Sequence, residues 1–244
     1  MIKLEHVVLA SPEQMEFIIE GMRNPMNSWD KSDSGNGCYS GLCSGSCTFS
    51  PQWCGNTPRY VLGENDCTLM QKLSKAGTDH RKYMRMMPVY VRITAPLYWW
   101  KEFDTYKIGT VANSCSTMHK IAEKEFTLDD FSTEHLKTGA IICLNDTIDE
   151  LNKNRDRFIN FDSACYDNNI YDPERKAEIK KDIWWQMIQI LPSSYNQTRN
   201  VMMNYEVLAN IYKSRKNHKL DEWRNFCKWI EELPYSELIT GGTE

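Results

Sequence analysis

The sequence lacks an excess of basic charge. Its 29 Lys and Arg residues are outnumbered by 33 Asp and Glu residues, which gives a net charge of -4. A protein that binds duplex nucleic acid through the phosphates is normally basic. Duplex nucleic acid is therefore excluded as a partner, although a pocket for one small anion remains compatible with this balance.

The sequence also lacks a long hydrophobic run and a recognisable export signal. Its most apolar stretch, Val89 to Trp100, is interrupted by Arg92 and is too short to cross a bilayer. The first ten residues carry charges within their apolar run and have no small-residue cleavage site. We therefore expect a cytoplasmic protein with no membrane partner.

Aromatic residues, in contrast, are well represented. They make up 11% of the 244 residues and include eight Trp. Their apolar area offsets the entropy of the chain, which excludes a disordered protein. A chain of this length buries a sizeable core as one large domain or two small ones.

Cysteine is the unusual feature of the composition, because five of the nine crowd into residues 38–67. In a cytosolic chain such a cluster favours metal binding or free thiols over disulfides. Four thiolates are candidates for one tetrahedral zinc ion, namely Cys38, Cys43, Cys47 and Cys54. No pair has the two-residue spacing of a zinc knuckle, so the alternative is a surface loop with reduced thiols.

The first third of the chain predicts a strand, two helices and a long insertion. Ile2 to Ala10 has the pattern of a strand, and a capping box at Ser11 opens the first helix. Asn24 to Tyr60 has no apolar periodicity and is interpreted as an inserted loop. Asn65 or Asp66 is predicted to cap the second helix.

The rest of the chain predicts one strand followed mainly by helices. Val89 to Ile93 alternates as a half-buried strand, and Pro96, Thr127 and Asp172 open helices. Three helical stripes follow: Ile179, Ile183, Met187 and Ile190; Val201, Tyr205, Leu208 and Tyr212; Trp223, Phe226, Cys227 and Ile230. The fold class is therefore α/β (α+β), as a single domain over residues 1–244 with a Cys-rich inserted loop at about 30–60.

A polar segment between residues 95 and 119 is the first candidate for chemistry. It carries small hydroxyl residues that are able to approach a phosphate closely, and Cys115 and His119 stand at the helical spacing of a nucleophile and its base. The alternatives are a polar turn with Trp99 and Trp100 in the core, and a Cys–His spacing that arises by chance.

The helix predicted after Pro192 is the second candidate. Its polar side chains interleave with apolar positions, which suggests a polar ligand against a packed helix. These side chains are Asn204, Glu206, Asn210, Arg215 and His218. The alternative is a solvated surface with ordinary capping of the helix end by cations.

In their order along the chain, these segments resemble the flavin-dependent thymidylate synthases, the ThyX family. Ala95-Pro96 opens a helix as in that family, and Thr105-Tyr106-Lys107 stands in the place of its Arg-His-Arg motif. Asn113 and Ser116 match the motif that follows. Upstream, Gly77 to Arg85 resembles the family's Gly-His-x-Ser/Thr-x-x-Glu segment.

The C-terminal part carries the firmest resemblance. Leu191-Pro192 precedes a helix in the family, and this chain then has Asn204, Leu208, Asn210 and Arg215 in the pattern of the family's helix. His218 follows, as a His does there. The resemblance covers most of the chain, with the Cys-rich loop as an insertion.

The resemblance implies a fold, a reaction and a set of partners. The fold has a central, mostly antiparallel sheet with packed helices and a helical C-terminal third. The reaction is reductive one-carbon transfer to dUMP or a related pyrimidine nucleotide, with FAD as cofactor and methylenetetrahydrofolate and NADPH as co-substrates. The assembly is a homotetramer whose active sites are shared between subunits.

The resemblance also assigns roles to individual residues. The cofactor-binding residues are Thr105, Tyr106, Lys107, Asn113, Asn204, Asn210, His80 and His218. The substrate-binding residues are Ser116, Thr117, Glu102 and Arg215. Of these, Arg215 and Ser116 are the catalytic residues, and Arg215 orients the base.

Several positions depart from the family pattern. Met118 and Ile188 stand where family arginines hold the nucleotide phosphate, Glu102 replaces a Gln, and Glu206 replaces an Arg. Each lost charge-assisted hydrogen bond costs about 1.5–3 kcal/mol. The residues available for compensation are Lys101, Lys107 and Arg199. In the upstream segment, Lys82 and Arg85 replace the family's Ser/Thr and Glu.

These departures leave three alternatives open. The first is a flavoenzyme of the same fold with another pyrimidine nucleotide or product. The second is a non-catalytic module that binds a nucleotide or a protein partner, because the Arg-His-Arg motif is absent. The third treats the Cys-rich loop as a zinc-stapled surface for protein or single-stranded nucleic acid.

Overall fold

The computed structural model describes residues 2–37, 59–168 and 170–241. The chain divides into two compact units: unit 1 is residues 1–3, 93–105 and 113–199, and unit 2 is residues 4–92, 106–112 and 200–244. The four cysteines proposed as zinc ligands lie outside the described residues, so a zinc site stays a prediction. The single domain with an inserted loop stays a prediction as well.

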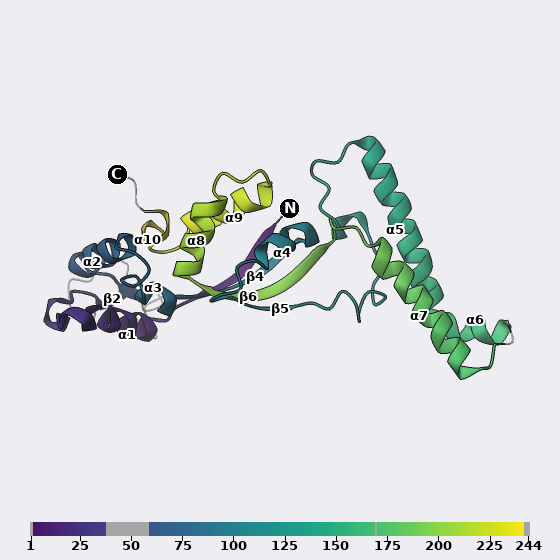
Figure 1. The fold of residues 1–244 in the computed structure, drawn as a ribbon, viewed down its shortest axis with the longest axis horizontal. Helices are drawn as coiled ribbons and strands as arrows, with labels where there is room; N and C mark the ends of the chain where they lie inside the picture. Colours follow the sequence, from purple (N-terminus) through teal and green to yellow (C-terminus); the bar gives the residue numbers. More distant parts are fainter. Residues whose placement is uncertain (1, 38–58, 169, 242–244) are drawn as a thin grey trace, which may run out of the picture. The chain divides into compact units, whose positions relative to one another are not determined.

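Four strands form the main sheet, in the order β1-β4-β6-β5 (Figure 1). The strands are β1 (Lys3–Leu9), β4 (Pro88–Pro96), β5 (Val111–Ser114) and β6 (Asn196–Asn204). The sheet is antiparallel, and together with the helices it gives a mixed α/β protein, which confirms the predicted fold class. Each of the four strands contributes residues to both units.

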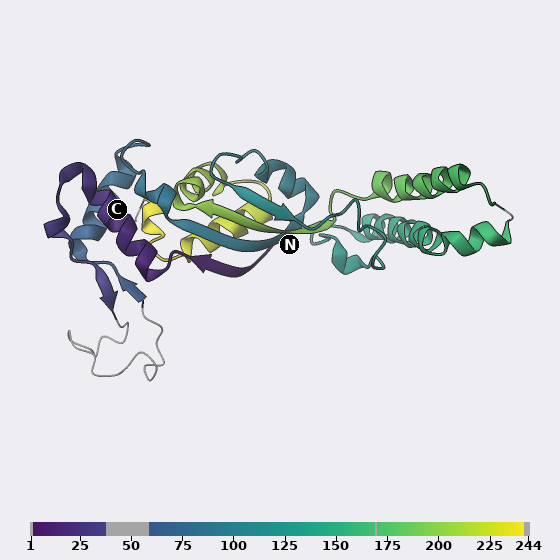
Figure 2. The same ribbon diagram turned by 90° about the horizontal axis from the view of Figure 1, so that it is seen from below.

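Unit 1 is built on a helical hairpin. Helices α5 and α7 lie against each other (Figure 2), and their apolar faces form a core with the segment before α5. The core residues are Ile121, Phe126, Phe131, Leu144, Ile148, Leu151 and Met187. The helices of this unit are α4 (Leu97–Phe103), η3 (Leu128–Asp130), α5 (Thr138–Ile159), α6 (Phe161–Asp167) and α7 (Pro173–Ile190).

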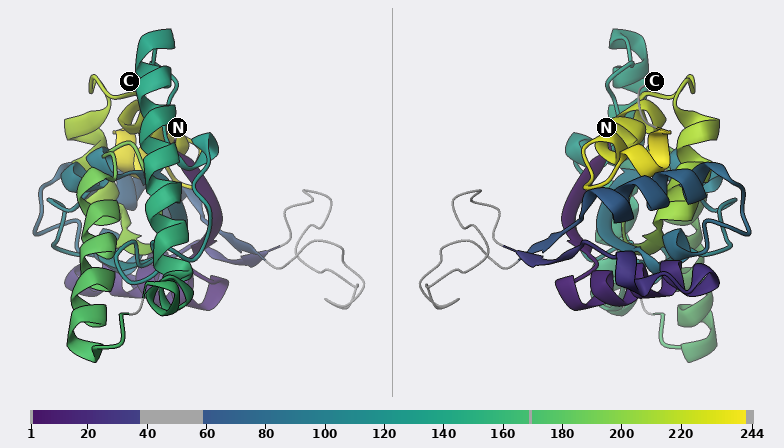
Figure 3. Two further views of the ribbon diagram at one scale, coloured as in Figure 1. Left: turned by 90° about the vertical axis from the view of Figure 1, so that its right-hand side faces the viewer. Right: turned by 90° about the vertical axis from the view of Figure 1, so that its left-hand side faces the viewer.

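Unit 2 packs helices from both ends of the chain around a second core. They are α1 (Pro12–Arg23), η1 (Asn24–Met26), η2 (Trp29–Lys31), α2 (Glu64–Lys75), α3 (Tyr83–Met86), α8 (Tyr205–Arg215), α9 (Asp221–Glu231) and α10 (Glu237–Thr240). Helix α8 contacts α3, α9 and α10. Two short strands, β2 (Gly35–Gly37) and β3 (Arg59–Val61), form a separate antiparallel ribbon (Figure 3). None of the helices in the described ranges is both long enough and apolar enough to cross a membrane.

The predicted helix start at Val201 is wrong, because Val201 belongs to strand β6. The segment has a burial period of two, with Gln197, Val201 and Met203 buried. A spacing of four between Val201 and Tyr205 fits a helix equally well, so the apolar positions alone did not separate the two structures. The helix begins at Tyr205 instead.

The predicted cap of helix α2 is also wrong. Asn65 and Asp66 lie inside the helix, and their backbone N–H groups donate to the Asp33 carboxylate at 2.9 and 3.1 Å. A carboxylate 32 residues upstream thus satisfies the free donors of this helix end. A helix cap is recognised in a sequence only when the capping residue lies next to the start of the helix. The contact from Asp33 therefore could not be predicted from the sequence.

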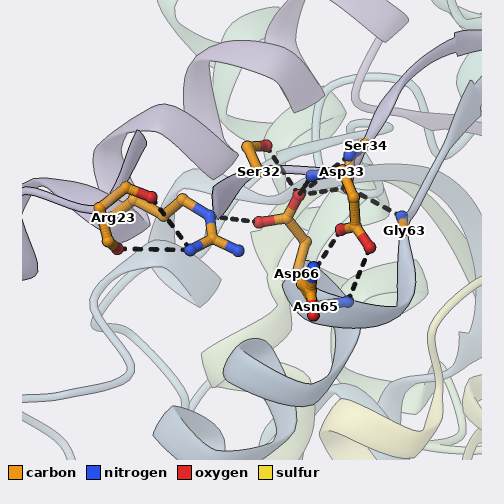
Figure 4. Close-up of polar contacts among 8 residues, drawn as sticks. Arg23, Ser32, Asp33, Ser34, Gly63, Asn65 and Asp66 are labelled. Atoms are coloured by element: carbon orange, nitrogen blue, oxygen red, sulfur yellow. Dashed lines mark hydrogen bonds and ion pairs between the residues drawn. The ribbon is translucent and has the colours of Figure 1, made fainter. Parts of the chain in front are cut away.

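Asp66 instead forms the centre of a buried polar network (Figure 4). Its side chain is completely buried and accepts from the Arg23 Nε at 2.5 Å, from the Ser32 and Ser34 hydroxyls at 2.8 and 2.6 Å, and from the backbone N–H groups of Asp33 and Ser34. The Ser34 hydroxyl in turn accepts from the Gly63 N–H at 2.9 Å. The network thus joins the segment that enters the β2–β3 ribbon to the segment that leaves it.

The network also sets the protonation of Asp66. Burial raises the pKa of this carboxyl, but the hydrogen bonds from Ser34, Ser32 and Arg23 outweigh burial and leave the pKa below its ordinary value. A lowered pKa in the folded state means that Asp66 stabilises the fold above the ordinary carboxyl range. That stabilisation is lost as pH falls through the lowered pKa.

We expect Asp66→Asn to lower the free energy of unfolding by about 3–5 kcal/mol, because the buried Arg23 guanidinium loses its counter-charge. Urea denaturation at neutral pH measures the loss. Asp30→Asn, on the exposed face of η2, is the matched control and should change stability by less than about 0.5 kcal/mol. The difference in the free energy of unfolding between wild type and Asp66→Asn should become smaller in acid. A difference that does not change with pH would contradict the lowered pKa of Asp66.

Candidate functional site

The junction between β6 and α8 positions most of the candidate side chains of unit 2. Asn204 ends the strand with extended backbone, and its Oδ1 accepts from the Val207 N–H at 3.0 Å as the N-cap of α8. Gly109 approaches the same turn with a φ of +78°, and a Cβ there would lie 3.0 Å from Val207 and 3.1 Å from the Asn204 amide nitrogen. Glycine at position 109 therefore permits the close approach.

Arg215, at the end of α8, meets the second residue of the Thr105-Tyr106-Lys107 segment. Its Nε donates to the Tyr106 hydroxyl at 3.0 Å, and its guanidinium lies 4.8 Å from the ring centroid of Trp223. Trp223 is fully buried, whereas Arg215 and Tyr106 are half-buried. A hydrogen bond and a cation–π contact thus hold the guanidinium in a fixed orientation.

Glu206, the second residue of α8, binds two arginines from the segment after α2. Its carboxylate accepts from Arg81 Nε at 3.0 Å and from Arg85 Nε, and Arg81 also donates to the Asn210 Oδ1 at 3.2 Å. Arg85 and Glu206 are two of the positions that depart from the ThyX pattern. In this structure the two side chains form an ion pair with each other.

The two arginines determine the charge of Glu206. Burial of this carboxyl raises its pKa, but the hydrogen bonds and positive charges of Arg85 and Arg81 outweigh burial and keep the pKa below its ordinary value. Glu206 is therefore ionised at neutral pH. As for Asp66, the lowered pKa means that Glu206 stabilises the fold at neutral pH, and that this stabilisation is lost as pH falls through the lowered pKa.

Unit 1 contains a separate cavity of about 600 Å³, which falls within the range of small-molecule sites. Ser116 and Thr117, two of the predicted substrate residues, line it. Its other lining residues are Lys3, Thr94, Cys115, Lys124, Leu128, Asp129, Asp130, Phe131, Thr133, Glu134, Tyr195, Asn196, Gln197 and Thr198. Sequence patterns did not point to the contribution of the loop at 128–134, which has no motif.

The remaining predicted residues have more local roles. Thr105 caps the end of α4, because its hydroxyl donates to the Glu102 carbonyl at 2.7 Å. Asn113 is exposed on β5, and Lys107 and His80 are exposed in loops. The His218 Nδ1 accepts from the Leu220 N–H at 3.2 Å in the turn that leads into α9.

The predicted nucleophile pair has no helix to support it. Residues 115–119 form an irregular segment and a turn, so the four-residue spacing of Cys115 and His119 does not place them on one face. In this turn the His119 N–H donates to the Ser116 hydroxyl at 3.1 Å. Within the described part of the chain, no three His, Cys, Asp or Glu side chains form a metal cluster.

The groups around α8 suit a flavin in their chemistry. The oxygen of each candidate amide is occupied, by Val207 at Asn204 and by Arg81 at Asn210, which leaves the amide nitrogens as donors. The Arg215 guanidinium adds an oriented cation. Donors and a cation match the carbonyl-rich ring and the phosphates of FAD.

Coupling energies test the Glu206 cluster. We expect Glu206→Gln to lower the free energy of unfolding by about 1–3 kcal/mol, because two guanidiniums lose their shared carboxylate. In double-mutant cycles from thermal or urea unfolding, Glu206 should couple more strongly to Arg81 than to Arg85, whose side chain is 44% exposed. The exposed Lys153–Glu150 pair is the control and should show no measurable coupling. Equal coupling in all three cycles would contradict this prediction.

Comparisons with known proteins establish the fold. A scan of family models finds no match, and neither does a search of curated proteins. Among solved structures, the chain is similar to ThyX from Helicobacter pylori with FAD and dUMP, with a TM-score of 0.54 and 14% identity over 97% of this chain and 94% of that one. It is also similar to PolB, a UMP/dUMP methylase from Streptomyces cacaoi bound to 5-Br dUMP, with a TM-score of 0.52 and 11% identity over 98% and 95% of the two chains. The chain therefore has a ThyX-like fold.

Proposed function

We propose that the protein is an FAD-dependent, thymidylate-synthase-like enzyme that transfers a one-carbon unit reductively to a pyrimidine nucleotide. The contact between Arg215 and Tyr106 carries the proposal. These residues lie 109 positions apart and belong to the two segments in which the sequence resembles the flavin-dependent synthases. They meet in a fold like that of proteins solved with FAD and dUMP.

The proposed roles follow the two groups of side chains. In unit 2, FAD would be held by Tyr106, Lys107, Asn204, Asn210, His80 and His218, with Arg215 as the residue that orients the base. In unit 1, the resemblance assigns Thr105 and Asn113 to the cofactor, and Ser116, Thr117 and Glu102 to the nucleotide. When bound, the flavin supplies the hydride equivalent of the reduction, with NADPH as reductant and methylenetetrahydrofolate as carbon donor.

The positions of the missing phosphate arginines affect the choice of substrate. Met118 is 47% exposed, and Ile188 packs against the core of unit 1. Arg199 does not replace them, because it donates to Asp104 at 2.7 Å and to the Gln197 Oε1 at 2.9 Å while its guanidinium lies 4.1 Å from the Trp100 ring. The substrate is therefore proposed as dUMP or another pyrimidine nucleotide rather than dUMP alone.

A homotetramer with shared active sites belongs to the same proposal. Apolar side chains on three strands of unit 2 remain exposed and are available for contacts with other subunits. They are Val7 and Val8 of β1, Tyr90 of β4 and Val111 of β5, with 38%, 47%, 48% and 62% of their surfaces exposed. Light scattering after size exclusion measures the assembly, and a stable monomer at micromolar concentration would oppose it.

The function is tested with the purified protein, FAD, NADPH, methylenetetrahydrofolate and a panel of pyrimidine nucleotides. A flavin absorbance band and a product heavier by a methyl group are the expected results. A colourless protein that takes up no added FAD would reject the enzyme. If that protein still binds a nucleotide, the non-catalytic module is the better assignment.

Arg215→Ala should reduce kcat/KM by about 100-fold or more, because the alanine neither orients the base nor supplies a positive charge. Tyr106→Phe keeps the ring but removes one hydrogen bond to Arg215, so a loss of about 3- to 10-fold is expected. Lys213→Ala, exposed on the same helix, is the control and should retain activity. Full activity in Arg215→Ala would refute its role.

A further inference from the structure

Trp223, the third residue of α9, lies among the candidate side chains of unit 2. The Arg215 guanidinium lies 4.8 Å from its ring centroid, and the ring centroids of Tyr106 and His218 lie 6.0 and 6.3 Å away. Sequence patterns place Trp223 among the apolar positions of its helix, and the resemblance assigns it no role. The structure gathers around it one residue proposed for the substrate and two proposed for the cofactor.

The turn between α8 and α9 holds Trp223 in this position. The His218 N–H donates to the Arg215 carbonyl at 2.9 Å, and the His218 Nδ1 accepts from the Leu220 N–H at 3.2 Å. Trp223 is itself completely buried, and its ring meets that of Phe226 edge to face at 6.0 Å. An indole held in this way offers the guanidinium a fixed surface.

The contact between Trp223 and Arg215 is electrostatic as well as steric. The face of an indole attracts a cation more strongly than that of a phenol or a phenyl ring, and the attraction grows away from water. Trp223 is fully buried and Arg215 half-buried, so the contact is partly desolvated. The Tyr106 ring lies 5.7 Å from the same guanidinium, so two aromatic side chains limit its movement.

We propose that Trp223 is a positioning residue for catalysis, which holds the Arg215 guanidinium through the cation–π contact in the orientation that meets the pyrimidine base. This inference rests on the proposed function, in which Arg215 orients the base. A long arginine side chain otherwise samples many rotamers, and ordering it at each binding event lowers affinity and rate. A guanidinium that is ordered before the substrate arrives avoids this cost.

Nuclear magnetic resonance relaxation of the Arg215 Nε–H group, in the full-length protein without ligands, tests the positioning. Trp223→Leu should lower its order parameter from about 0.85 to below about 0.6, and Trp223→Phe should preserve most of the order. Trp229→Leu, which removes an indole from the last turn of the same helix, is the matched control and should leave the order unchanged. An Arg215 that is equally ordered in Trp223→Leu would overturn the proposal, and so would one that is already mobile in the wild type.

Turnover tests the consequence for the reaction. With concentrations referred to bound flavin, Trp223→Leu should reduce kcat/KM by about 10- to 30-fold, Trp223→Phe by about 3-fold and Trp229→Leu by less than about 2-fold. Full activity in Trp223→Leu beside a large loss in Arg215→Ala would overturn the proposal. A wild-type protein that takes up no FAD and makes no product would refute the proposed function instead, and the order parameter would still decide whether Trp223 fixes Arg215.

Fluorinated tryptophans at position 223 separate electrostatic attraction from packing. Each added fluorine withdraws charge from the ring face and changes the shape of the ring little, so the guanidinium is attracted less. An increasing number of fluorines should therefore lower kcat/KM stepwise, whereas the same series at Trp229 should leave it unchanged. Equal activity across the series at position 223 would overturn the cation–π role, and this result is accessible even where Trp223→Leu fails to fold.

Discussion

The N-cap of α8 is the constraint on which the candidate site of unit 2 depends. Asn204 is both the last residue of β6 and the N-cap of α8. Its side-chain oxygen accepts a hydrogen bond from the backbone N–H of Val207 in the first helical turn. The helix that begins there brings Glu206, Asn210 and Arg215 to their partners at successive turns. A start one residue later would rotate each of these side chains by about 100° away from its partner.

Two buried carboxylates organise the rest of unit 2 by a shared principle. Asp66 and Glu206 each accept several hydrogen bonds. These bonds outweigh the cost of burial, from two serines and Arg23 at Asp66 and from two arginines at Glu206, and they keep each pKa below its ordinary value. Asp66 joins the ends of the segment that carries β2 and β3, while Glu206 ties α8 to the arginines that follow α2. Both are long-range contacts, so they connect parts of the chain that local propensity does not bring together.

Local sequence signals predicted the elements whose pattern was unambiguous. The capping box at Ser11, the alternation through Val91 and the apolar stripe of α9 all correspond to observed elements. Strand β5 was missed because all four of its residues are exposed and show no alternation. Helix α5 was missed although Leu144, Ile148 and Leu151 carry a helical spacing, because no cap marks its start.

By itself the sequence determined the fold class and the order of the motifs, because periodicity and spacing are local properties. Only the tertiary structure decided which of these residues meet. It paired Arg215 with Tyr106, brought Arg85 and Glu206 together as an ion pair, and placed Ser116 in the wall of a cavity. These contacts join residues about 100 positions apart or side chains from separate loops. The spacing of residues along a sequence does not show which of the many possible long-range contacts forms.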